Sequence, residues 1–508
     1  MKRVYIFTFV VTVAALVISC YKDKGNYSFA ASEIITVTGI SSSYDKISQQ
    51  DRITLTPVVS SSLPNANFEY FWGIYETNVQ GSAPKIDTIA KTLSIDYLIT
   101  KPAKTWVLVF GAKNNTTGLQ QLVTSNINVI TPFTRGWYVL KDDGSNTDMD
   151  LFLTPTTIVP SSQLNNVFSI VNGKKLNGKA QFLSFDNSYK SSVTGVLGNT
   201  RALFVTSDKD ASVIDINSLL EIHDFNGMFY SPPSIKAPTY VGPGSQADFF
   251  INAGQLYSIN SMSTNVGLFA ARQLKDALNT DYYLSKYFIN FTLANPIFFD
   301  EKSSSFVSAG AGGSVLNSIT DATGTAMKAN NNNKTLLYMG IKTSAATPTG
   351  IALFQDKTNA SLKILSTITA NTAAFSISND TLLNTSKLYS ATLVTTNLVD
   401  ENFIYFVVGN QVWSRNLSNK FEQLQYTAPA GETITFLRHK KYTAEASYAH
   451  NYIVIGTKSG ANYTIRMFSK TSGNLAATPD ITMTGIGSVG DIIYMSPSVG
   501  TYTYLPTY

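Results

Sequence analysis

One pattern of apolar and polar residues recurs through the second part of the chain, and it limits the possible folds more than any other feature. From Trp137 to Tyr508, a short apolar run is followed by a polar turn and then by a second apolar run. Short apolar runs separated by Gly, Asn, Asp and Ser are typical of β-hairpins. The clearest hairpins are predicted at residues 202–216, 249–259, 403–413 and 452–468.

The spacing of these hairpins predicts a β-propeller over residues 135–508. The intervals from Val205 to Ile251 and from Val407 to Ile455 match one four-stranded blade of ~40–50 residues. At that spacing, the ~370 residues of this part would form seven or eight blades, which is within the usual range. The repeats are degenerate, since the sequence has no Gly-His…Trp-Asp signature, no kelch double glycine and no Asp-box.

Two stretches interrupt the strand pattern and are predicted to be insertions, near residues 268–290 and 308–333. The first contains the best helical window of the chain, from Ala270 to Leu278. The second is rich in Gly, Ser, Ala and Asn and is predicted to be a loop or an irregular excursion. Insertions in a propeller project from one face, which is often the binding face.

The first part of the chain, residues 33–131, predicts a smaller β-sandwich. It holds around seven short strand patterns, and the pattern from Phe68 to Tyr75 carries Trp72 on a central strand. This arrangement indicates an Ig-like sandwich, although without a cysteine pair it is not a true immunoglobulin domain. The predicted fold class is therefore all-β, with an Ig/PKD-like sandwich followed by a propeller.

The N-terminus has the pattern of a bacterial lipoprotein signal. Lys2 and Arg3 precede an apolar run from Val4 to Ile18, which is too short and wrongly flanked for a stop-transfer helix. Ser19 then precedes Cys20, the single cysteine of the sequence. We therefore predict a signal peptide over residues 1–19, a lipidated Cys20 and a tether over residues 20–32. The alternative is a cysteine that lies near a cleavage site by chance.

This anchor would hold the protein at a membrane by acyl chains, each buried CH₂ contributing about 0.8 kcal/mol. Beyond the signal, no apolar stretch is long enough to cross a bilayer. With Cys20 acylated, no thiol remains for disulfides or for cysteine chemistry.

The charge balance speaks against a nucleic-acid partner. The net charge of +5 falls to +3 when Lys2 and Arg3 leave with the signal, and no basic stripe is present.

Two motifs resemble ligand-binding sequences, but each is explained more simply as a turn or hairpin between strands. The glycines of residues 485–490 have dinucleotide-binding spacing, but a strand rather than a helix follows, so a turn between blade strands is predicted. The acidic run from Asp142 to Asp150 offers oxygen ligands for Ca²⁺, but its glycine is misplaced for an EF-hand. A solvated hairpin is favoured there, and no metal is predicted.

No motif supports catalysis, and no cofactor is predicted. The adjacent acids at 300–301 and 400–401 would point to opposite faces of a strand, so neither pair is a ready acid/base couple. His223, His439 and His450 lack zinc-site spacing, and no nucleophile elbow or Walker loop is present. Distant acids could still converge in a propeller funnel, which leaves a surface hydrolase or lyase as the alternative function.

Surface aromatic rings are the remaining candidates for ligand binding. Tyr282, Tyr283 and Tyr287 lie next to the first insertion and are predicted to stack on sugars or peptide side chains. Core packing is an equal alternative for these three, and it is the favoured interpretation for Trp72 and Trp413, because large rings are mostly buried.

Residues 20–27, with the sequence Cys-Tyr-Lys-Asp-Lys-Gly-Asn-Tyr, resemble the mature N-terminus of the PKD-like family lipoproteins of Bacteroidetes. The likeness continues through residues 35–40, the strand from Phe68 to Trp72, and Thr117-Gly118. It extends into the second part through residues 135–140 and 171–179, and thins out after about residue 260.

The resemblance implies an outer-membrane lipoprotein at the cell surface that works beside SusC/SusD-type transporters. Such systems capture glycans or peptides, and family members are described as binding or accessory components. The expected function is thus a non-catalytic accessory role in nutrient uptake. One departure concerns exposure: surface-exported lipoproteins of this phylum usually carry several acids after the cysteine, whereas Asp23 lies between Lys22 and Lys24.

Overall fold

The computed structural model describes residues 32–48, 50–76, 85–155, 161–192, 197–244, 246–260, 264–290, 296–309, 313–343, 348–504 and 508. The chain divides into two compact units, Met1–Val129 and Ile130–Tyr508. The predicted signal peptide, Cys20 and the tether up to residue 31 lie outside the described residues. Among the helices that the structure does describe, none has the length and apolar character needed to span a membrane.

The first unit is a sandwich built from one large sheet and two strand pairs. The large sheet has the order β2-β9-β8-β5-β6, and the pairs are β1 with β4 and β3 with β7. The strands are β1 (Ile35–Thr38), β2 (Ser43–Ile47), β3 (Arg52–Leu55), β4 (Val58–Ser61), β5 (Phe68–Glu76), β6 (Asp87–Ala90), β7 (Ile95–Leu98), β8 (Lys104–Asn114) and β9 (Gln120–Ile130).

Trp72 lies at the centre of this sandwich. Its side chain is fully buried, and its ring centroid lies 4.7 Å from that of Phe110 on the neighbouring strand β8. The indole Nε1 donates a hydrogen bond to the carbonyl oxygen of Thr92 at 3.1 Å, so that burial leaves no polar atom of the ring unpaired. The predicted Ig-like sandwich with a core tryptophan is confirmed.

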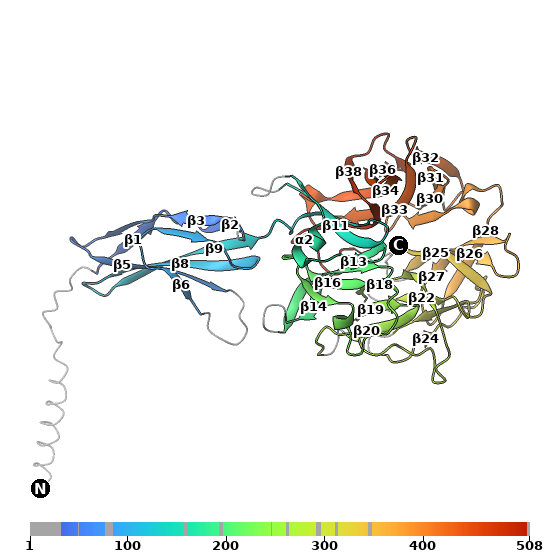
Figure 1. Cartoon of the computed structure of the whole chain (residues 1–508), viewed down its shortest axis with the longest axis horizontal. Coiled ribbons are helices and arrows are strands. Elements are labelled where there is room, and N and C mark those ends of the chain that lie inside the picture. The colour runs from blue at the N-terminus through green and yellow to red at the C-terminus, as the bar shows by residue number, and fades with distance from the viewer. Residues whose placement is uncertain are drawn as a thin grey trace, which may run out of the picture. The chain divides into compact units, whose positions relative to one another are not determined.

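The second unit is a β-propeller, as the hairpin spacing predicts. Within the described residues, its blades are seven sheets, in chain order β10 to β13 with β39, β14 to β17, β18 to β20, β21 to β24, β25 to β28, β29 to β32, and β33 to β35 with β38. A separate hairpin, β36 with β37, is inserted in the seventh blade (Figure 1).

The inner strands of the seven blades, in order, are β39 (Ser488–Met495), β14 (Ala180–Ser191), β18 (Pro238–Pro243), β21 (Leu284–Ile289), β25 (Lys334–Thr343), β29 (Leu393–Thr396) and β33 (Thr433–Tyr442). The other strands are β10 (Gly136–Asp142), β11 (Asn146–Leu153), β12 (Gln163–Leu164), β13 (Leu176–Asn177), β15 (Gly198–Ser207), β16 (Ala211–Asp215), β17 (Glu221–Asp224), β19 (Ala247–Asn252), β20 (Gln255–Asn260), β22 (Ile297–Asp300), β23 (Ser305–Ser308), β24 (Asn317–Ser318), β26 (Thr349–Asp356), β27 (Lys363–Thr369), β28 (Ser376–Thr381), β30 (Phe403–Val408), β31 (Gln411–Asn416), β32 (Glu422–Thr427), β34 (His450–Ser459), β35 (Asn462–Phe468), β36 (Lys470–Thr471), β37 (Asn474–Leu475) and β38 (Ile481–Ile486). The short helices of this unit are α2 (Val167–Asn172), η1 (Asn226–Met228), η2 (Lys387–Ser390) and η3 (Ala446–Tyr448).

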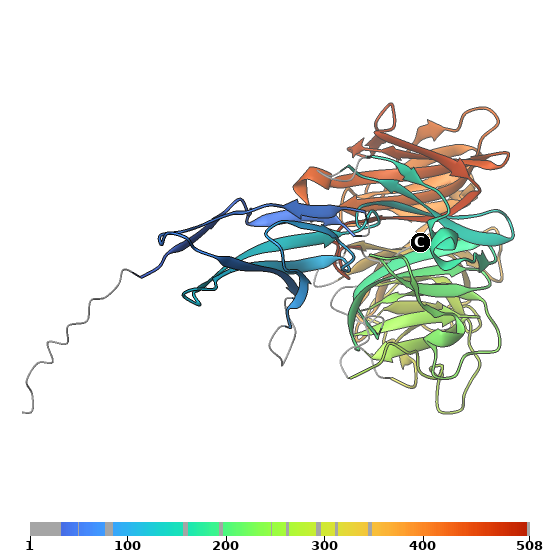
Figure 2. The ribbon, with the colours of Figure 1, turned by 60° about the vertical axis from the view of Figure 1, so that its left-hand side comes forward.

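The ring closes because the first blade takes strands from both ends of the unit. β39 pairs antiparallel with β10, with Trp137 opposite Tyr494. This pairing joins the C-terminal part of the unit to its first blade and so closes the ring. The final residue, Tyr508, lies at the middle of the ring of sheets in both views (Figure 1 and Figure 2).

The predicted hairpins are present as β15–β16, β19–β20, β30–β31 and β34–β35. The turn between β19 and β20 shows why glycine is needed there. Gly254 has φ +71°, and a Cβ atom at this position would lie 2.4 Å from Cδ2 of Tyr283. Both the left-handed backbone and the close ring exclude a larger residue.

The helix expected at 270–278 is not formed. Gln273 is buried and its backbone N–H donates to the carbonyl oxygen of Leu256 at 2.8 Å, while Leu274 donates to Ser314 at 2.7 Å. These backbone groups therefore bond to neighbouring segments instead of to the preceding turn, so tertiary contacts override helix propensity. The end of this predicted insertion is an inner strand, β21.

The second predicted insertion is irregular, as expected. Its described part contains the two-residue strand β24 and isolated bridges from Val315 to Leu274 and from Asp321 to Phe375.

The acidic run at 142–150 forms the expected hairpin, between β10 and β11, but its later acids are buried rather than solvated. Asp150 forms a 2.8 Å ion pair with Lys141 and accepts a hydrogen bond from the Tyr463 hydroxyl at 2.8 Å. Partners inside the propeller thus replace water around this carboxylate. The glycines at 485–490 lie at the junction of β38 and β39, which is the predicted turn between strands.

Candidate functional site

A cavity of about 380 Å³ opens beside the inner strands of the second and seventh blades. Three parts of the chain that are distant in sequence form it: strand β14, the end of β33 with the residues after it, and the segment 500–504. Its lining residues are Phe182, Leu183, Ser184, Phe185, Leu398, Val399, His439, Lys440, Lys441, Thr443, Ala444, Ile493, Gly500, Thr501, Tyr502, Thr503 and Tyr504.

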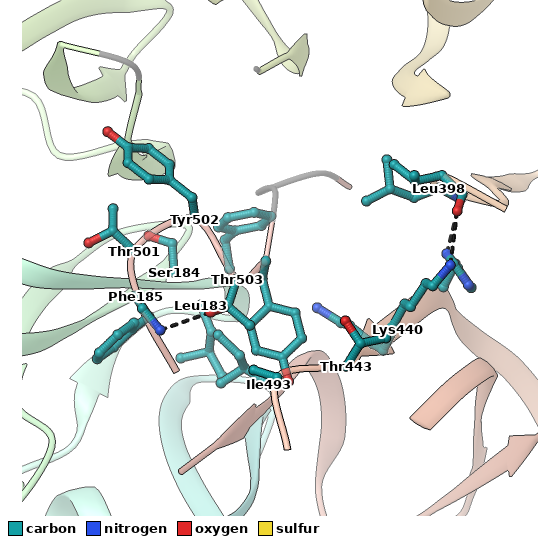
Figure 3. A pocket seen from close by; sticks show the side chains of 17 residues that line it. Leu183, Ser184, Phe185, Leu398, Lys440, Thr443, Ile493, Thr501, Tyr502 and Thr503 are labelled. Carbon is teal, nitrogen blue, oxygen red and sulfur yellow. Dashed lines mark hydrogen bonds between the residues drawn. The ribbon is translucent and has the colours of Figure 1, made fainter. Parts of the chain in front are cut away.

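The segment 500–504 forms one wall of the cavity. Figure 3 shows Thr501, Tyr502 and Thr503 on one side and Leu398 opposite them. Thr501 donates to a carboxylate oxygen of Asp186 on β14 at 2.7 Å, and the Tyr502 hydroxyl donates to the carbonyl oxygen of Gly244 at 3.1 Å. These bonds fix the wall against the second and third blades. Tyr502 remains 45% exposed.

Basic side chains from β33 form the opposite side. Lys441 donates to the carbonyl oxygen of Val399 at 2.9 Å, and Lys440 lies 3.4 Å from a carboxylate oxygen of Asp491. Burial lowers the pKa of Lys440, and the charge of Asp491 opposes this shift. Asp491 also accepts a hydrogen bond from the backbone N–H of Leu183 at 3.0 Å. Its carboxylate therefore contacts residues from two walls of the cavity, Lys440 on β33 and Leu183 on β14.

His439 is engaged on both ring nitrogens. Nδ1 accepts from the backbone N–H of Leu398 at 3.0 Å, which places the ring proton on Nε2, 2.7 Å from Oδ1 of Asn451. Burial, with a contribution from the charge of Lys470, lowers the pKa of His439 to about 3. A neutral histidine with both nitrogens bonded positions the Leu398 loop and has no free nitrogen to act as a base.

Among the described residues that line the cavity, none carries a carboxylate. Asp186 and Asp248 are both buried, and neither lines the cavity. Burial, and then the charge of Asp186, raise the pKa of Asp248 well above its ordinary value. Asp186 is already bonded to Ser188 and Thr501. Within the part of the chain that the structure describes, no group of three or more His, Cys, Asp or Glu residues could hold a metal ion.

The three tyrosines predicted to bind ligand do not form one surface. Tyr282 is fully buried, its hydroxyl donates to the carbonyl oxygen of Gln273 at 2.7 Å, and it accepts from the backbone N–H of Leu256 at 3.0 Å. Its expected role is therefore corrected to core packing. Tyr283 is 46% exposed and covers the turn at Gly254.

Tyr287 points in another direction, toward the centre of the ring of blades around Tyr508, which we call the hub. Its ring centroid lies 5.4 Å from that of Tyr338 and 5.8 Å from that of Tyr508. Trp72 is core, as favoured from the sequence. Trp413 is half-buried, and the ammonium of Lys387 lies 5.1 Å from its ring centroid.

The cavity was not found from the sequence, because its walls come together only in the closed propeller. One local signal was available. The run Thr501-Tyr502-Thr503-Tyr504 alternates hydroxyl and aromatic side chains, and all four residues line the cavity.

Residues 20–180 match the model of the PKD-like family. The match begins at Cys20, continues through the rest of the first unit and ends at the first residue of β14, so all of the residues that line the cavity lie beyond it. No curated protein matches the sequence.

Among solved structures, the chain is similar to a quinonprotein alcohol dehydrogenase-like protein from Bacteroides thetaiotaomicron. The identity is 13%, the TM-score is 0.42, and 90% of this chain and 97% of that chain are covered. The chain is also similar to dihydro-heme d1 dehydrogenase NirN, with 8% identity and a TM-score of 0.38. The match covers 73% of this chain and 77% of that chain. A third similar structure is the WD40 domain of SCAP from fission yeast, with 8% identity and a TM-score of 0.33. The match covers 63% of this chain and 74% of that chain. At these identities and TM-scores, the matches say nothing about ligand or activity.

Proposed function

We propose that the protein is a non-catalytic binding lipoprotein of the outer-membrane surface, anchored through Cys20, that serves a SusC/SusD-type nutrient uptake system. The observation that carries the proposal is the cavity beside β14 and β33. It combines aromatic rings, hydroxyl groups and two lysines, and none of its described lining residues is a carboxylate.

The lining suits a short glycan. A volume of about 380 Å³ lies at the lower end of the ~300–1,000 Å³ range of small-molecule sites. Rings such as Tyr502 offer a flat face to a sugar ring, while the hydroxyls of Thr443 and Thr503 and the lysine ammonium groups can bond to sugar hydroxyls. A peptide is the competing ligand class, and the binding experiment below separates the two.

Binding is favoured over hydrolysis because the lining lacks the paired carboxylates that glycoside cleavage requires. The one histidine of the cavity is held neutral with both nitrogens bonded. No contact of the described cavity residues favours the alternative of a hydrolase or lyase.

Calorimetric titration of the full chain in mild detergent, with di- and trisaccharides and with tripeptides, tests the binding site. We expect a saccharide to bind, and we expect Tyr502→Ala to weaken it about tenfold, or ~1.4 kcal/mol. Tyr230→Ala is the matched control, because Tyr230 is 66% exposed and does not line the cavity. Binding of tripeptides alone, or equal affinities in both variants, would contradict the assignment.

The accessory role is tested separately by a mild-detergent pull-down of the tagged, lipidated protein from its native membrane. Recovery of a large β-barrel transporter with its lid lipoprotein, identified by mass spectrometry, is the expected result. Recovery of the protein alone would count against a role in uptake. The family match that starts at Cys20 supports testing the lipidated form.

A further inference from the structure

Two cations from opposite sides of the propeller meet at its hub. Lys286 lies on β21 of the fourth blade and Arg438 on β33 of the seventh. The Lys286 ammonium lies 5.2 Å from the centroid of the Tyr508 ring, and the Arg438 guanidinium carbon lies 5.4 Å from the same centroid. One ring can contact both strands only near the axis, so Tyr508 marks the hub and the cations lie around it.

Neither cation has an acidic partner. Among the described residues, the ion pairs of the propeller involve other lysines and arginines, and none of them includes Lys286 or Arg438. Arg438 donates from Nη1 to the carbonyl oxygen of Leu437 at 2.9 Å, and its Nε is buried without a hydrogen-bond partner.

Buried and partly buried lysines elsewhere in the propeller behave differently. Lys141 is paired with Asp150 and Lys440 with Asp491. The buried Lys342 donates to three backbone carbonyl oxygens, including that of Asn397 at 2.9 Å. The propeller thus supplies partners for these lysines, whereas Lys286 is exposed to solvent and contacts the rings of Tyr287 and Tyr508.

The electrostatics of this pair favour an anion. Partial desolvation by the surrounding protein, and then the charge of Arg438, lower the pKa of Lys286, while its side chain stays accessible to solvent. Two like charges beside the same ring, with no acidic partner in an ion pair, repel each other, and a bound anion reduces that repulsion. The rings of Tyr287 and Tyr508 exclude water from part of the surroundings and so strengthen a charge-assisted hydrogen bond.

We propose that Lys286 and Arg438 form a binding site for the carboxylate group of a small organic acid. A planar carboxylate matches the donor geometry of a guanidinium and can take a second bond from an ammonium. Neither residue lines the cavity described above, so this site is separate from the proposed glycan site. Phe182 is the residue that links the two regions, since it lines the cavity and its ring centroid lies 4.8 Å from that of Tyr508.

Calorimetric titration of the full chain with glucuronate, with glucose as the neutral probe of the same size, tests this site. We expect glucuronate to bind and glucose not to compete with it. Lys286→Gln and Arg438→Gln should each weaken glucuronate about tenfold or more, the effect of losing a hydrogen bond to a charged group. Arg438→Lys, which keeps the charge, should lose less than Arg438→Gln.

Lys302→Gln is the matched control, because it removes one positive charge from an exposed ion pair with Asp281 on the same blade. It should leave the affinity for glucuronate unchanged, and so should Tyr502→Ala, which alters the cavity. Thermal unfolding of each variant verifies that the propeller is folded.

The proposal is overturned if glucuronate fails to bind, if the two hub variants bind it as tightly as the wild type, or if glucose displaces it. Equal competition by inorganic sulfate would show that the hub takes any small anion and would overturn the assignment to a carboxylate.

Discussion

Arg438 and Tyr508 lie against each other at the hub of the propeller, with the guanidinium carbon 5.4 Å from the ring centroid. The same ring packs against Phe182 with a centroid distance of 4.8 Å, and its hydroxyl donates to the carbonyl oxygen of Thr239. A single residue thus joins inner strands of the second, third, fourth and seventh blades.

Replacement of Tyr508 should therefore destabilise the propeller. The side chain is almost completely buried, so Tyr508→Ala should lower the free energy of unfolding by about 3–5 kcal/mol through lost burial and a cavity. Tyr508→Phe, which removes only the hydrogen bond to Thr239, should cost about 1 kcal/mol. Urea unfolding followed by tryptophan fluorescence measures both, and equal losses in the two variants would contradict this packing.

Lys141→Met should also destabilise the propeller, by about 3–5 kcal/mol, because it leaves the fully buried Asp150 without its cation. Lys175→Met is the matched control: it breaks the exposed pair with Asp143 and should cost at most about 1 kcal/mol. Urea unfolding of both variants gives the comparison. Similar losses would mean that the buried pair is no more important than the surface pair.

His439 should remain neutral throughout the range from pH 5 to pH 8. Its pKa in the folded state is about 3, mainly because of burial, whereas the ordinary value is 6.5. The unfolded state therefore binds the extra proton first, and this residue's contribution to stability is present above pH 6.5 and is lost as the pH falls toward 3. A nuclear magnetic resonance titration of the ring should show no change above pH 5, and a midpoint near 6.5 would contradict the buried, doubly bonded arrangement.

Cys20→Ser should abolish lipid attachment, since the thiol is the predicted acylation site. Labelling with a radioactive fatty acid should mark the wild type only, and the variant should lose its detergent-dependent partition. A variant that is still labelled would place the acyl group elsewhere and remove the predicted anchor.

The hairpins of the fold were predictable from the sequence because a few adjacent residues determine each turn. Ala253-Gly254 and Gly409-Asn410 specify their hairpins through backbone conformations that few residues adopt, so both were found where expected. The helix predicted at 270–278 is wrong because helix propensity contributes little free energy. The backbone hydrogen bonds that Gln273 and Leu274 make to other segments outweigh it.

The candidate site was not predictable in the same way. Tyr282 and Tyr283 are neighbours in sequence, yet Tyr282 is buried in the core and Tyr283 is exposed. Their burial depends on which side of the chain packs against the blade, and the sequence does not show this. The cavity depends on contacts between residues about 300 positions apart, such as Thr501 with Asp186. The unpaired state of Lys286 and Arg438 is visible only once the seven inner strands surround a common axis.

The central claim, that the propeller binds its ligand without converting it, is tested most directly by mass spectrometry of the ligand itself. The purified full chain would be incubated with a binding oligosaccharide for several hours, and the bound and free sugar would then be released and weighed. We predict that all of the sugar returns with its original mass. Shortened or unsaturated products that are absent from a protein-free incubation would contradict the account and identify the protein as a hydrolase or a lyase.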